Sequence, residues 1–369
     1  MYIHEYTDWP HFTWNQAKLA FLLAEVRHLQ GRLLGRMDTL GFDLREEATL
    51  YSLTEDVVKT SEIEGEKLNN EQVRSSLARH LGIDIGAALP VDRHVEGIVE
   101  VMLDATRNYE LTLTQERLFK WHAALFPTGR SGMTQITVGD WRSGKSGPMQ
   151  VISGAFGKEK IHYEAPDHTR LNAETSLFLK WLNAPSKTDL IIKSAIAHFW
   201  FVTIHPFEDG NGRIARALAD MLLARSEHSK QRFYSMSAQI QHERSAYYDI
   251  LEQCQKGSLD ITAWVEWFLH CLKRAITSSS QTLTVVLSRA RFWELHTGEM
   301  FNERQRNIIN RLLDGMEGKL NTSKWAKLSK CSQDTALRDI NDLLERKILM
   351  KDSAGGRSTS YQLYIEKIK

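Results

Sequence analysis

The chain has 369 residues, of which 42% are hydrophobic and 25% charged, and its formal net charge is +1. This composition indicates a globular protein with room for two or three domains and a large core. The near-zero net charge argues against wholesale attraction to nucleic acid or membranes. No apolar stretch approaches the ~18 residues of a membrane span, so we expect no membrane segment.

The spacing of the cysteines and histidines further limits the class of protein. The three cysteines, Cys254, Cys271 and Cys331, show no Cys-x-x-Cys spacing, which predicts reduced thiols in a cytoplasmic protein. The first residues lack the basic and apolar regions of a signal peptide. None of the 14 histidines forms the His-Glu-x-x-His pattern of zinc hydrolases.

The first 14 residues are rich in aromatic side chains, and we expect them to dock onto the core. They include Tyr2, Tyr6, Trp9, Phe12 and Trp14. Thr13 and Gln16 then form a capping-box pattern, and apolar residues at helical spacing predict a helix that continues to Met37.

A second helix is predicted from about Glu46 to Glu64. Gly65 follows it and suits a C-terminal cap. A carboxylate at the end of a helix faces the negative end of its dipole, which is unfavourable unless a cation meets it. Glu64 is therefore expected to have a cationic partner, the alternative being a solvated glutamate.

Further helices are predicted over 70–81, 91–107 and 114–125, with His122 as a core residue. Residues 139–146, Gly-Asp-Trp-Arg-Ser-Gly-Lys-Ser, fit the P-loop pattern literally. A P-loop needs a buried strand before it and a helix that starts at its lysine. Here Gly147-Pro148 follow at once and the chain shows no parallel βαβ pattern. We therefore interpret the stretch as the turn into a hairpin.

Residues 150–153 and 161–164 predict that β-hairpin, almost the only β signal in the first 300 residues. A lone hairpin in a helical protein has an open edge, and open edges accept an extended peptide. A purely structural hairpin is the alternative. The hairpin residues in question are Val151, Ile152, Ser153, Ile161, His162 and Tyr163.

Residues 205–216, His-Pro-Phe-Glu-Asp-Gly-Asn-Gly-Arg-Ile-Ala-Arg, lie between two predicted helices. The apolar stretch 190–204 before them is long enough for a buried helix, and apolar residues recur at helical spacing after them. The turn Gly210-Asn211-Gly212 therefore opens the second helix. A helix N-terminus binds anions, and the glycines let a phosphate approach the backbone closely.

The charged residues of this loop suit chemistry on a nucleotide. Arg213 and Arg216 share a helix face and could fork onto two successive phosphates. Asp209 is a hard oxygen ligand suited to Mg²⁺, and His205 is a general base near neutral pH. These residues predict phosphate-transfer chemistry, the alternative being a structural glycine turn with a core histidine.

The same twelve residues resemble the signature of the Fic family, His-Pro-Phe-x-x-Gly-Asn-Gly-Arg-x-x-Arg, at every fixed position. Most members of that family transfer AMP from ATP onto a protein hydroxyl. The resemblance implies that His205 deprotonates a Ser, Thr or Tyr hydroxyl and that Asp209 holds Mg²⁺ between the α- and β-phosphates.

The resemblance also implies how the loop binds ATP. Asn211 and the backbone of Gly210 and Gly212 would hold the α-phosphate, while Arg213 and Arg216 would bind the β- and γ-phosphates. Phe207 would anchor the loop in the core. Tyr247 and Tyr248 lie in a helix predicted over 238–253, where one of them would face the adenine or ribose. Core packing is the alternative for both tyrosines.

Two other segments resemble parts of Fic proteins. Thr60, Glu64 and Gly65 match the inhibitory motif Ser/Thr-x-x-x-Glu-Gly/Asn, which implies that Glu64 pairs with Arg216 and displaces the γ-phosphate. The predicted hairpin corresponds to the flap that holds the target segment over the active site. The start of the chain is similar to the helical domain often found ahead of Fic domains.

The remaining helices of the bundle are predicted over 171–182, 261–272 and 281–295. The last block, 301–369, is net basic, with fourteen Lys/Arg against nine Asp/Glu. Helices over 304–316, 322–330 and 332–346 precede strands 348–351 and 359–364, which flank the turn signal Gly355-Gly356.

This last block resembles a winged helix-turn-helix domain. The resemblance would place Gln333, Thr335 and Arg338 in a DNA major groove and Arg357 on the wing, where phosphate contacts are usual. Winged helices also mediate dimerisation, so a homodimer is the alternative use of this block.

We therefore predict a mainly α protein, with a Fic-type helical bundle, a β-hairpin flap and a C-terminal winged helix domain. The expected domains are 1–85 with the inhibitory helix, 86–298 with the catalytic site, and 299–369. The expected function is a cytoplasmic protein adenylyltransferase that uses ATP and Mg²⁺, modifies a target protein or itself, and is inhibited by Glu64. The alternatives are a DNA-binding regulator that senses nucleotides, an enzyme that removes AMP, and transfer of another phosphate-containing group.

Overall fold

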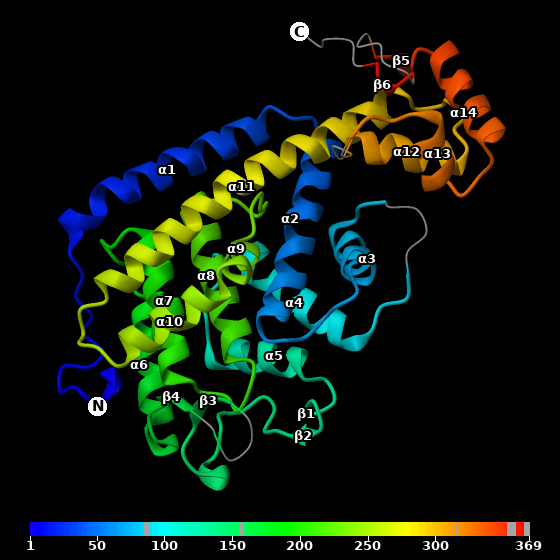
Figure 1. Cartoon of the computed structure of the whole chain (residues 1–369). Helices are drawn as coiled ribbons and strands as arrows, with labels where there is room; N and C mark the ends of the chain where they lie inside the picture. Colours follow the sequence, from blue (N-terminus) through cyan, green and yellow to red (C-terminus); the bar gives the residue numbers. More distant parts are fainter. Residues whose placement is uncertain are drawn as a thin grey trace. The chain divides into compact units, whose positions relative to one another are not determined.

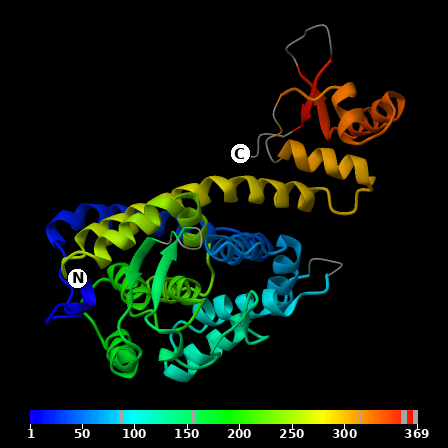
Figure 2. The same cartoon turned by 60° about the horizontal axis from the view of Figure 1, so that its bottom comes forward.

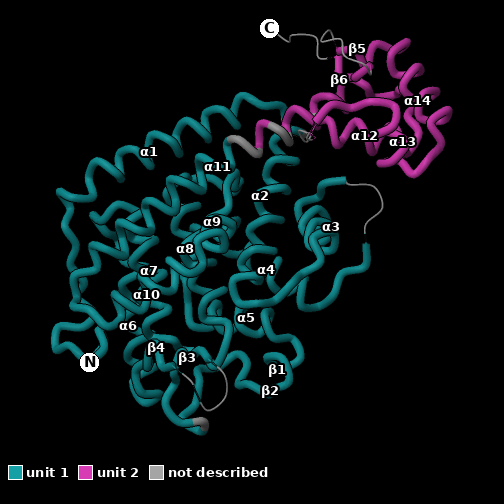
Figure 3. Tube along the Cα trace, in the orientation of Figure 1, with its two compact units in different colours: residues 1–280 teal, residues 281–369 magenta. Residues whose placement is uncertain are grey.

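The computed structural model describes residues 1–84, 89–154, 158, 160–313, 316, 318–352 and 359–364. The chain divides into two compact units, residues 1–280 and 281–369 (Figure 3). Helices dominate both, as predicted. No helix within the described ranges combines the length and apolarity needed to cross a membrane.

The described residues of the first unit form a helical bundle with two small antiparallel strand pairs (Figure 1). Its helices are α1 (Gln16–Asp38), α2 (Phe42–Ile63), α3 (Asn70–Leu81), α4 (Arg93–Arg107), α5 (Gln115–Leu125), α6 (Leu171–Asn183), α7 (Leu190–Ile204), α8 (Asn211–Glu227), α9 (Met236–His242), α10 (Arg244–Gln255) and α11 (Thr262–Leu295), the last of which continues into the second unit. Its strands are β1 (Arg130–Ser131), β2 (Thr134–Gln135), β3 (Gln150–Ser153) and β4 (Lys160–Glu164).

Helix α7 lies at the centre of this bundle because its residues are apolar on every side. All of them except Leu190 are buried, which is typical of a helix surrounded by other elements. It packs against α8 and α6, while α4 covers another side of α8. Helices α1 and α11 lie side by side across one face (Figures 1 and 2), joined by the ion pairs Lys18–Glu266 at 2.6 Å and Glu25–Lys273 at 2.9 Å.

The aromatic N-terminal segment docks onto this core, as expected. The rings of Trp9 and Phe12 pack edge-on against Trp200, and Tyr2 packs edge-on against Tyr163. The capping-box prediction for α1 was wrong. Asn15 is the N-cap, and its side chain accepts the N–H of Lys18. Thr13 instead bonds through its backbone to Leu259 and Ile261.

Helix α2 begins at Phe42, four residues earlier than expected, and ends at Ile63. Gly65 has a φ of +86°, a left-handed conformation that suits glycine after a helix. The buried Asp56 side chain accepts hydrogen bonds from Ser235 Oγ at 2.5 Å and Ser237 N at 3.1 Å. This contact fixes α2 against the start of α9.

The prediction for residues 238–295 needs two corrections. The helix predicted over 238–253 is two helices, α9 and α10, which meet at Glu243. The two helices predicted over 261–272 and 281–295 are one, α11. The polar run before residue 281 does not break it, because hydroxyls bond to carbonyls four residues earlier, as Ser280 Oγ does with Ile276 O.

Besides the end of α11, the described residues of the second unit form three helices and one antiparallel strand pair near their predicted positions. These are α12 (Glu303–Leu313), α13 (Thr322–Leu328), α14 (Gln333–Glu345), β5 (Leu349–Lys351) and β6 (Tyr361–Leu363). Trp325, Ile308 and Ile340 are fully buried in its hydrophobic core. Gly355, Gly356 and Arg357 lie outside the described residues.

Candidate active site

His205 ends α7 in a left-handed conformation, with a φ of 50°. Its ring Nδ1 lies 3.2 Å from Val202 O. A carbonyl oxygen only accepts hydrogen bonds, so Nδ1 carries the proton and Nε2 is left to accept one. Burial lowers the pKa of His205 from 6.5 to about 4. The imidazole is therefore neutral at pH 7 and can act as a base.

The loop between α7 and α8 is held in shape by its own side chains. Asn211 Nδ2 donates to Phe207 O at 2.8 Å, and Asn211 Oδ1 accepts from Phe207 N at 2.9 Å. Phe207 is fully buried and stacks on His122, with ring centroids 4.1 Å apart. Glu208 accepts the N–H of Thr137 at 2.9 Å. The side chain of Asn211 thus clamps the loop, and Phe207 lies in the core.

Arg142 holds the same loop from outside, and our sequence analysis did not identify it. Its Nε donates to His205 O at 2.8 Å, and its backbone N–H donates to Pro206 O at 2.9 Å. It belongs to the P-loop-like stretch, where Gly144–Ser146 form a 3₁₀ turn and not the start of an α-helix. The neighbouring Trp141 packs on Phe207. This stretch therefore supports the loop at residues 205–216.

Two buried arginines stand at the start of α8. Within the described part of the chain, Arg213 Nε and Arg216 Nη1 are buried without a hydrogen-bond partner. Buried donors are rarely left unpaired, so these atoms indicate a site for an anion. Gly210 precedes them with a φ of +79°, and a Cβ there would lie 2.9 Å from the Phe126 ring. The turn therefore requires glycine.

Carboxylates from the end of α2 contact both arginines. Arg216 Nη2 donates to Glu64 Oε1 at 2.7 Å and to Thr60 O at 2.9 Å. Arg213 Nη1 donates to Glu66 Oε2 at 2.8 Å. A Cβ on Gly212 would lie only 2.2 Å from Glu64 Oε1. Glu64 therefore lies directly against the helix N-terminus, in the place suited to an anion.

Asp209 is the carboxylate in the loop that could hold a metal ion. It is 40% exposed, and its two oxygens bond to Gly210 N and Ser131 Oγ. Carboxylate oxygens retain further lone pairs. Mg²⁺ is commonly bound by one or two carboxylates together with substrate phosphates and water, so Asp209 fits this ion. Ser131 lies on the small β1–β2 pair, which the sequence pattern did not reveal.

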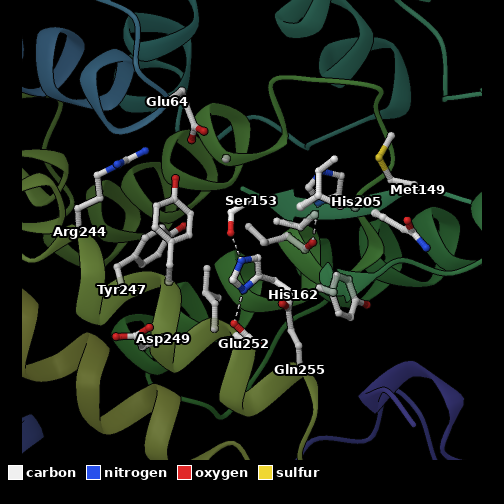
Figure 4. A pocket seen from close by; sticks show the side chains of 18 of the residues that line it. Glu64, Met149, Ser153, His162, His205, Arg244, Tyr247, Asp249, Glu252 and Gln255 are labelled. Atoms are coloured by element: carbon white, nitrogen blue, oxygen red, sulfur yellow. Dashed lines mark hydrogen bonds and ion pairs between the residues drawn. The ribbon is translucent and has the colours of Figure 1, made fainter. Parts of the chain in front are cut away.

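A cavity of about 690 Å³ lies against part of this site (Figure 4). This volume is in the usual range for small-molecule sites. Glu64, His205 and Gly212 line it together with Tyr247 and Tyr248.

The two tyrosines are also part of the packing around the cavity. Tyr247 is buried, and its hydroxyl lies 2.9 Å from His198 Nε2. Tyr248 is 36% exposed, and its hydroxyl donates to Ile63 O at 3.4 Å. Both therefore contact protein groups and face the cavity.

The β3–β4 hairpin forms one wall of the cavity through Val151, Ile152, Ser153, His162 and Tyr163. Ile152 and Ile161 are about half exposed. Tyr163 is buried and donates to Thr203 O at 2.8 Å, so it anchors the hairpin to α7. The register shifts between Val151 and Ile152, which marks a β-bulge.

The residues predicted to contact DNA lie on α14 of the second unit. Gln333 and Arg338 are exposed, while Thr335 is half-buried and its backbone N–H bonds to Ser332 Oγ as part of the helix cap. Arg357 lies outside the described residues.

Comparison with known proteins gives a family match that includes the loop at residues 205–216. Residues 112–223 match the Fic/DOC family, and residues 2–83 match a domain of unknown function, DUF4172. The chain is 29% identical over 220 residues to "Protein adenylyltransferase Fic" of Culex quinquefasciatus and 28% identical over 222 residues to that of Aedes aegypti. Each match covers 58% of this chain and 39% of the relative, so the chain spans about two fifths of these relatives.

Solved structures show the same fold. A Fic family protein from Desulfovibrio desulfuricans superposes with a TM-score of 0.55 at 21% identity, over 96% of this chain and 98% of that one. A Fic domain-containing signaling protein from Bacteroides thetaiotaomicron superposes with a TM-score of 0.51 at 19% identity, over 75% and 100%. Residues 112–223 therefore form a Fic/DOC domain, and the chain is related at modest identity to Fic protein adenylyltransferases.

Proposed function

We propose that this protein is an adenylyltransferase that moves AMP from ATP to a hydroxyl of a protein target or of itself. The observation that carries the proposal is one cavity lined by a neutral histidine and by the start of α8, beside which two arginines have unpaired donors. A base and an anion site next to each other are what transfer of a phosphate-linked group to a hydroxyl requires.

In this reaction the triphosphate binds at the start of α8, with Arg213 and Arg216 on successive phosphates. The acceptor oxygen forms a bond to the α-phosphorus while the bond from that phosphorus to the β-phosphate oxygen breaks. Pyrophosphate leaves, and the hydroxyl proton goes to His205 Nε2. The hydrogen bonds of Asn211 to Phe207 and of Arg142 to His205 O hold the base in place during this step.

Asp209 would hold Mg²⁺ here, because it is exposed and lies close to Arg213, with Oδ1 3.8 Å from Nη2. The ion would neutralise charge on the phosphates when it is bound.

We infer that α2 holds the enzyme inactive through two carboxylates. Glu64 pairs with Arg216. The same guanidinium also donates from Nε to Thr60 Oγ1, at 2.7 Å. Glu66 pairs with Arg213. Phosphate oxygens would compete with both carboxylates, so Glu66→Gln should strengthen ATP binding. The expected gain is smaller than for Glu64, because the Glu66 side chain is 48% exposed and exposed ion pairs contribute little.

The experiment that tests the transferase compares ATP labelled at the α-phosphate with ATP labelled at the γ-phosphate. The Glu64→Gly variant should incorporate the α-label into protein but not the γ-label, and the added change His205→Ala should abolish incorporation into an added target protein. Incorporation of the γ-label would indicate a kinase-like transfer and contradict the proposal. No incorporation of either label would favour a nucleotide sensor, removal of AMP or another donor.

We also propose that the second unit is a winged helix domain that binds DNA through α14. The exposed side chains of Gln333 and Arg338 near its start and the excess of basic residues over 301–369 support this. Arg338→Ala should weaken binding to a random duplex about tenfold at low salt, as measured by fluorescence anisotropy. Unchanged binding would contradict this assignment.

A further inference from the structure

The β-bulge in the hairpin directs His162 toward two other side chains. Val151 pairs with Tyr163 and Ile152 pairs with Ile161, so His162 is the extra residue of the bulge. Bulges commonly redirect a side chain next to an active site. His162 Nε2 lies 2.6 Å from Ser153 Oγ, and His162 Nδ1 lies 2.5 Å from Glu252 Oε2 (Figure 4).

The ionisation state of Glu252 determines which atom in each of these hydrogen bonds carries the proton. Lys256 Nζ donates to Glu252 Oε1 at 2.6 Å. The hydrogen bonds from Lys256 and then His162 lower the pKa of the Glu252 carboxyl to about 2. An ionised carboxylate only accepts, so His162 Nδ1 carries the proton and Nε2 accepts the proton of Ser153 Oγ. Nucleophile, base and orienting carboxylate are thus in line.

The array faces the nucleotide cavity. Ser153, His162 and Glu252 line the same cavity as His205 and Gly212, and Ser153 is exposed. Strand β4 contacts α10, which carries Glu252. The activated hydroxyl in this wall of the cavity is therefore one of the protein's own side chains, that of Ser153.

We propose that Ser153 is a nucleophilic acceptor that takes the nucleotidyl group from a nucleoside triphosphate bound in this cavity, with His162 as its base. The inference rests on the proposed function. Ser153 Oγ forms a bond to the α-phosphorus, and the bond from that phosphorus to the β-phosphate oxygen breaks. Pyrophosphate leaves, and the Ser153 proton moves to His162 Nε2. Glu252 orients the imidazole and stabilises its charged form. The product is a phosphodiester on the hairpin.

The chain contains a matched control in Ser245. It lines the same cavity and is exposed. Its hydroxyl bonds only weakly, to Asp249 at 3.5 Å, and among the described residues no histidine forms a hydrogen bond with it. Modification of Ser153 and of Ser245 can therefore be compared in the same molecule at the same nucleotide concentration.

The test is peptide mapping by mass spectrometry of the full chain after incubation with ATP and Mg²⁺, in the Glu64→Gly background. AMP is expected on Ser153 at an occupancy at least tenfold above that on Ser245. His162→Gln and, separately, Glu252→Gln should each lower the rate of modification at Ser153 by roughly 100-fold. Circular dichroism checks that each variant is folded.

The outcomes separate this inference from the proposed function. AMP on other hydroxyls with an unmodified Ser153, or equal rates in Glu64→Gly chains with and without His162→Gln, would overturn the role of Ser153 or of His162 and leave the transferase standing. No AMP on any residue would contradict both. A fluorophosphonate reagent, which needs no nucleotide, should still label Ser153 in preference to Ser245; absence of that label would overturn the activation of Ser153.

Discussion

The loop between α7 and α8 and the β3–β4 hairpin line the same cavity but are built in opposite ways. The loop is closed by the two bonds of Asn211 to Phe207 and is tied from outside by Arg142. The hairpin leaves Ile152 and Ile161 about half exposed. One wall is thus fixed with precision, as chemistry on a phosphate needs. The other is open, with exposed apolar side chains, and we expect it to accept an extended peptide.

The largest effect should come from the base of the rigid wall. His205→Ala should lower the rate of AMP transfer to an added protein by at least about 100-fold, because it removes the general base, while ATP affinity changes little. Calorimetric titration with ATP and single-turnover labelling measure the two quantities. His228→Ala is the matched control, since His228 is exposed and ends α8 with a similar φ of 49°. A wild-type rate of transfer in His205→Ala would show that His205 is not the general base.

The clamp of the rigid wall can be separated from its chemistry. Asn211→Ala leaves two backbone groups of Phe207 unpaired and should cost about 2–4 kcal/mol of stability, together with most of the transfer activity. Asn183 forms the same two-bond clamp on Leu113, at 3.0 and 2.8 Å. Asn183 is exposed whereas Asn211 is buried, so Asn183→Ala should lose less stability in urea unfolding and keep its activity at temperatures where it is folded. Equal loss of activity in both would contradict a specific role of the loop clamp.

The open wall should show the reverse behaviour. Ile152→Ser changes a side chain that is 54% exposed, so the free energy of unfolding should change by less than about 0.5 kcal/mol. Transfer to an added protein should nevertheless fall several-fold, because the hairpin would lose an apolar contact to the acceptor. Exposed Leu177 on α6 offers a control in Leu177→Ser. If both variants transfer AMP at the wild-type rate, the hairpin does not contact the acceptor.

The last prediction concerns the stability of the fold in acid. Burial lowers the pKa of His205 and His122 from 6.5 to about 4, and that of His198 to about 3. The unfolded chain therefore binds more protons than the folded chain between pH 6.5 and about 4. Stability should be full above pH 6.5 and fall below it, by roughly 1.4 kcal/mol per pH unit for each histidine. Thermal unfolding from pH 7.5 to 5 measures this slope, and a flat profile would contradict it.

Local patterns predicted much of the fold. The range 70–81 matches α3 to the residue, and the apolar stretch 190–204 is α7. The wrong predictions of helix boundaries involve contacts between residues distant in sequence or polar side chains that form hydrogen bonds within a helix. The break at Glu243 coincides with its ion pair to Arg274, 31 residues away, and α11 continues because its hydroxyls bond within the helix.

The site was predictable where its residues are contiguous. The loop at 205–216 carries its base and its arginines in one stretch, so spacing alone placed them together. Arg142, Ser131 and Glu66 reach it from other elements, and no periodicity connects them to it. The contact of Glu64 with Arg216 spans 152 residues, and only the resemblance suggested it.

The central claim is that the loop is a transfer site kept inactive by the end of α2. The most direct measurement is the initial rate of α-label incorporation from ATP in wild type, Glu64→Gly and Glu62→Gly. Glu62 lies on the last turn of the same helix but pairs with Lys59 at 2.9 Å, so it controls for glycine near the helix end. We predict a rate at least tenfold above wild type in Glu64→Gly only. Equal rates in all three chains would contradict the claim.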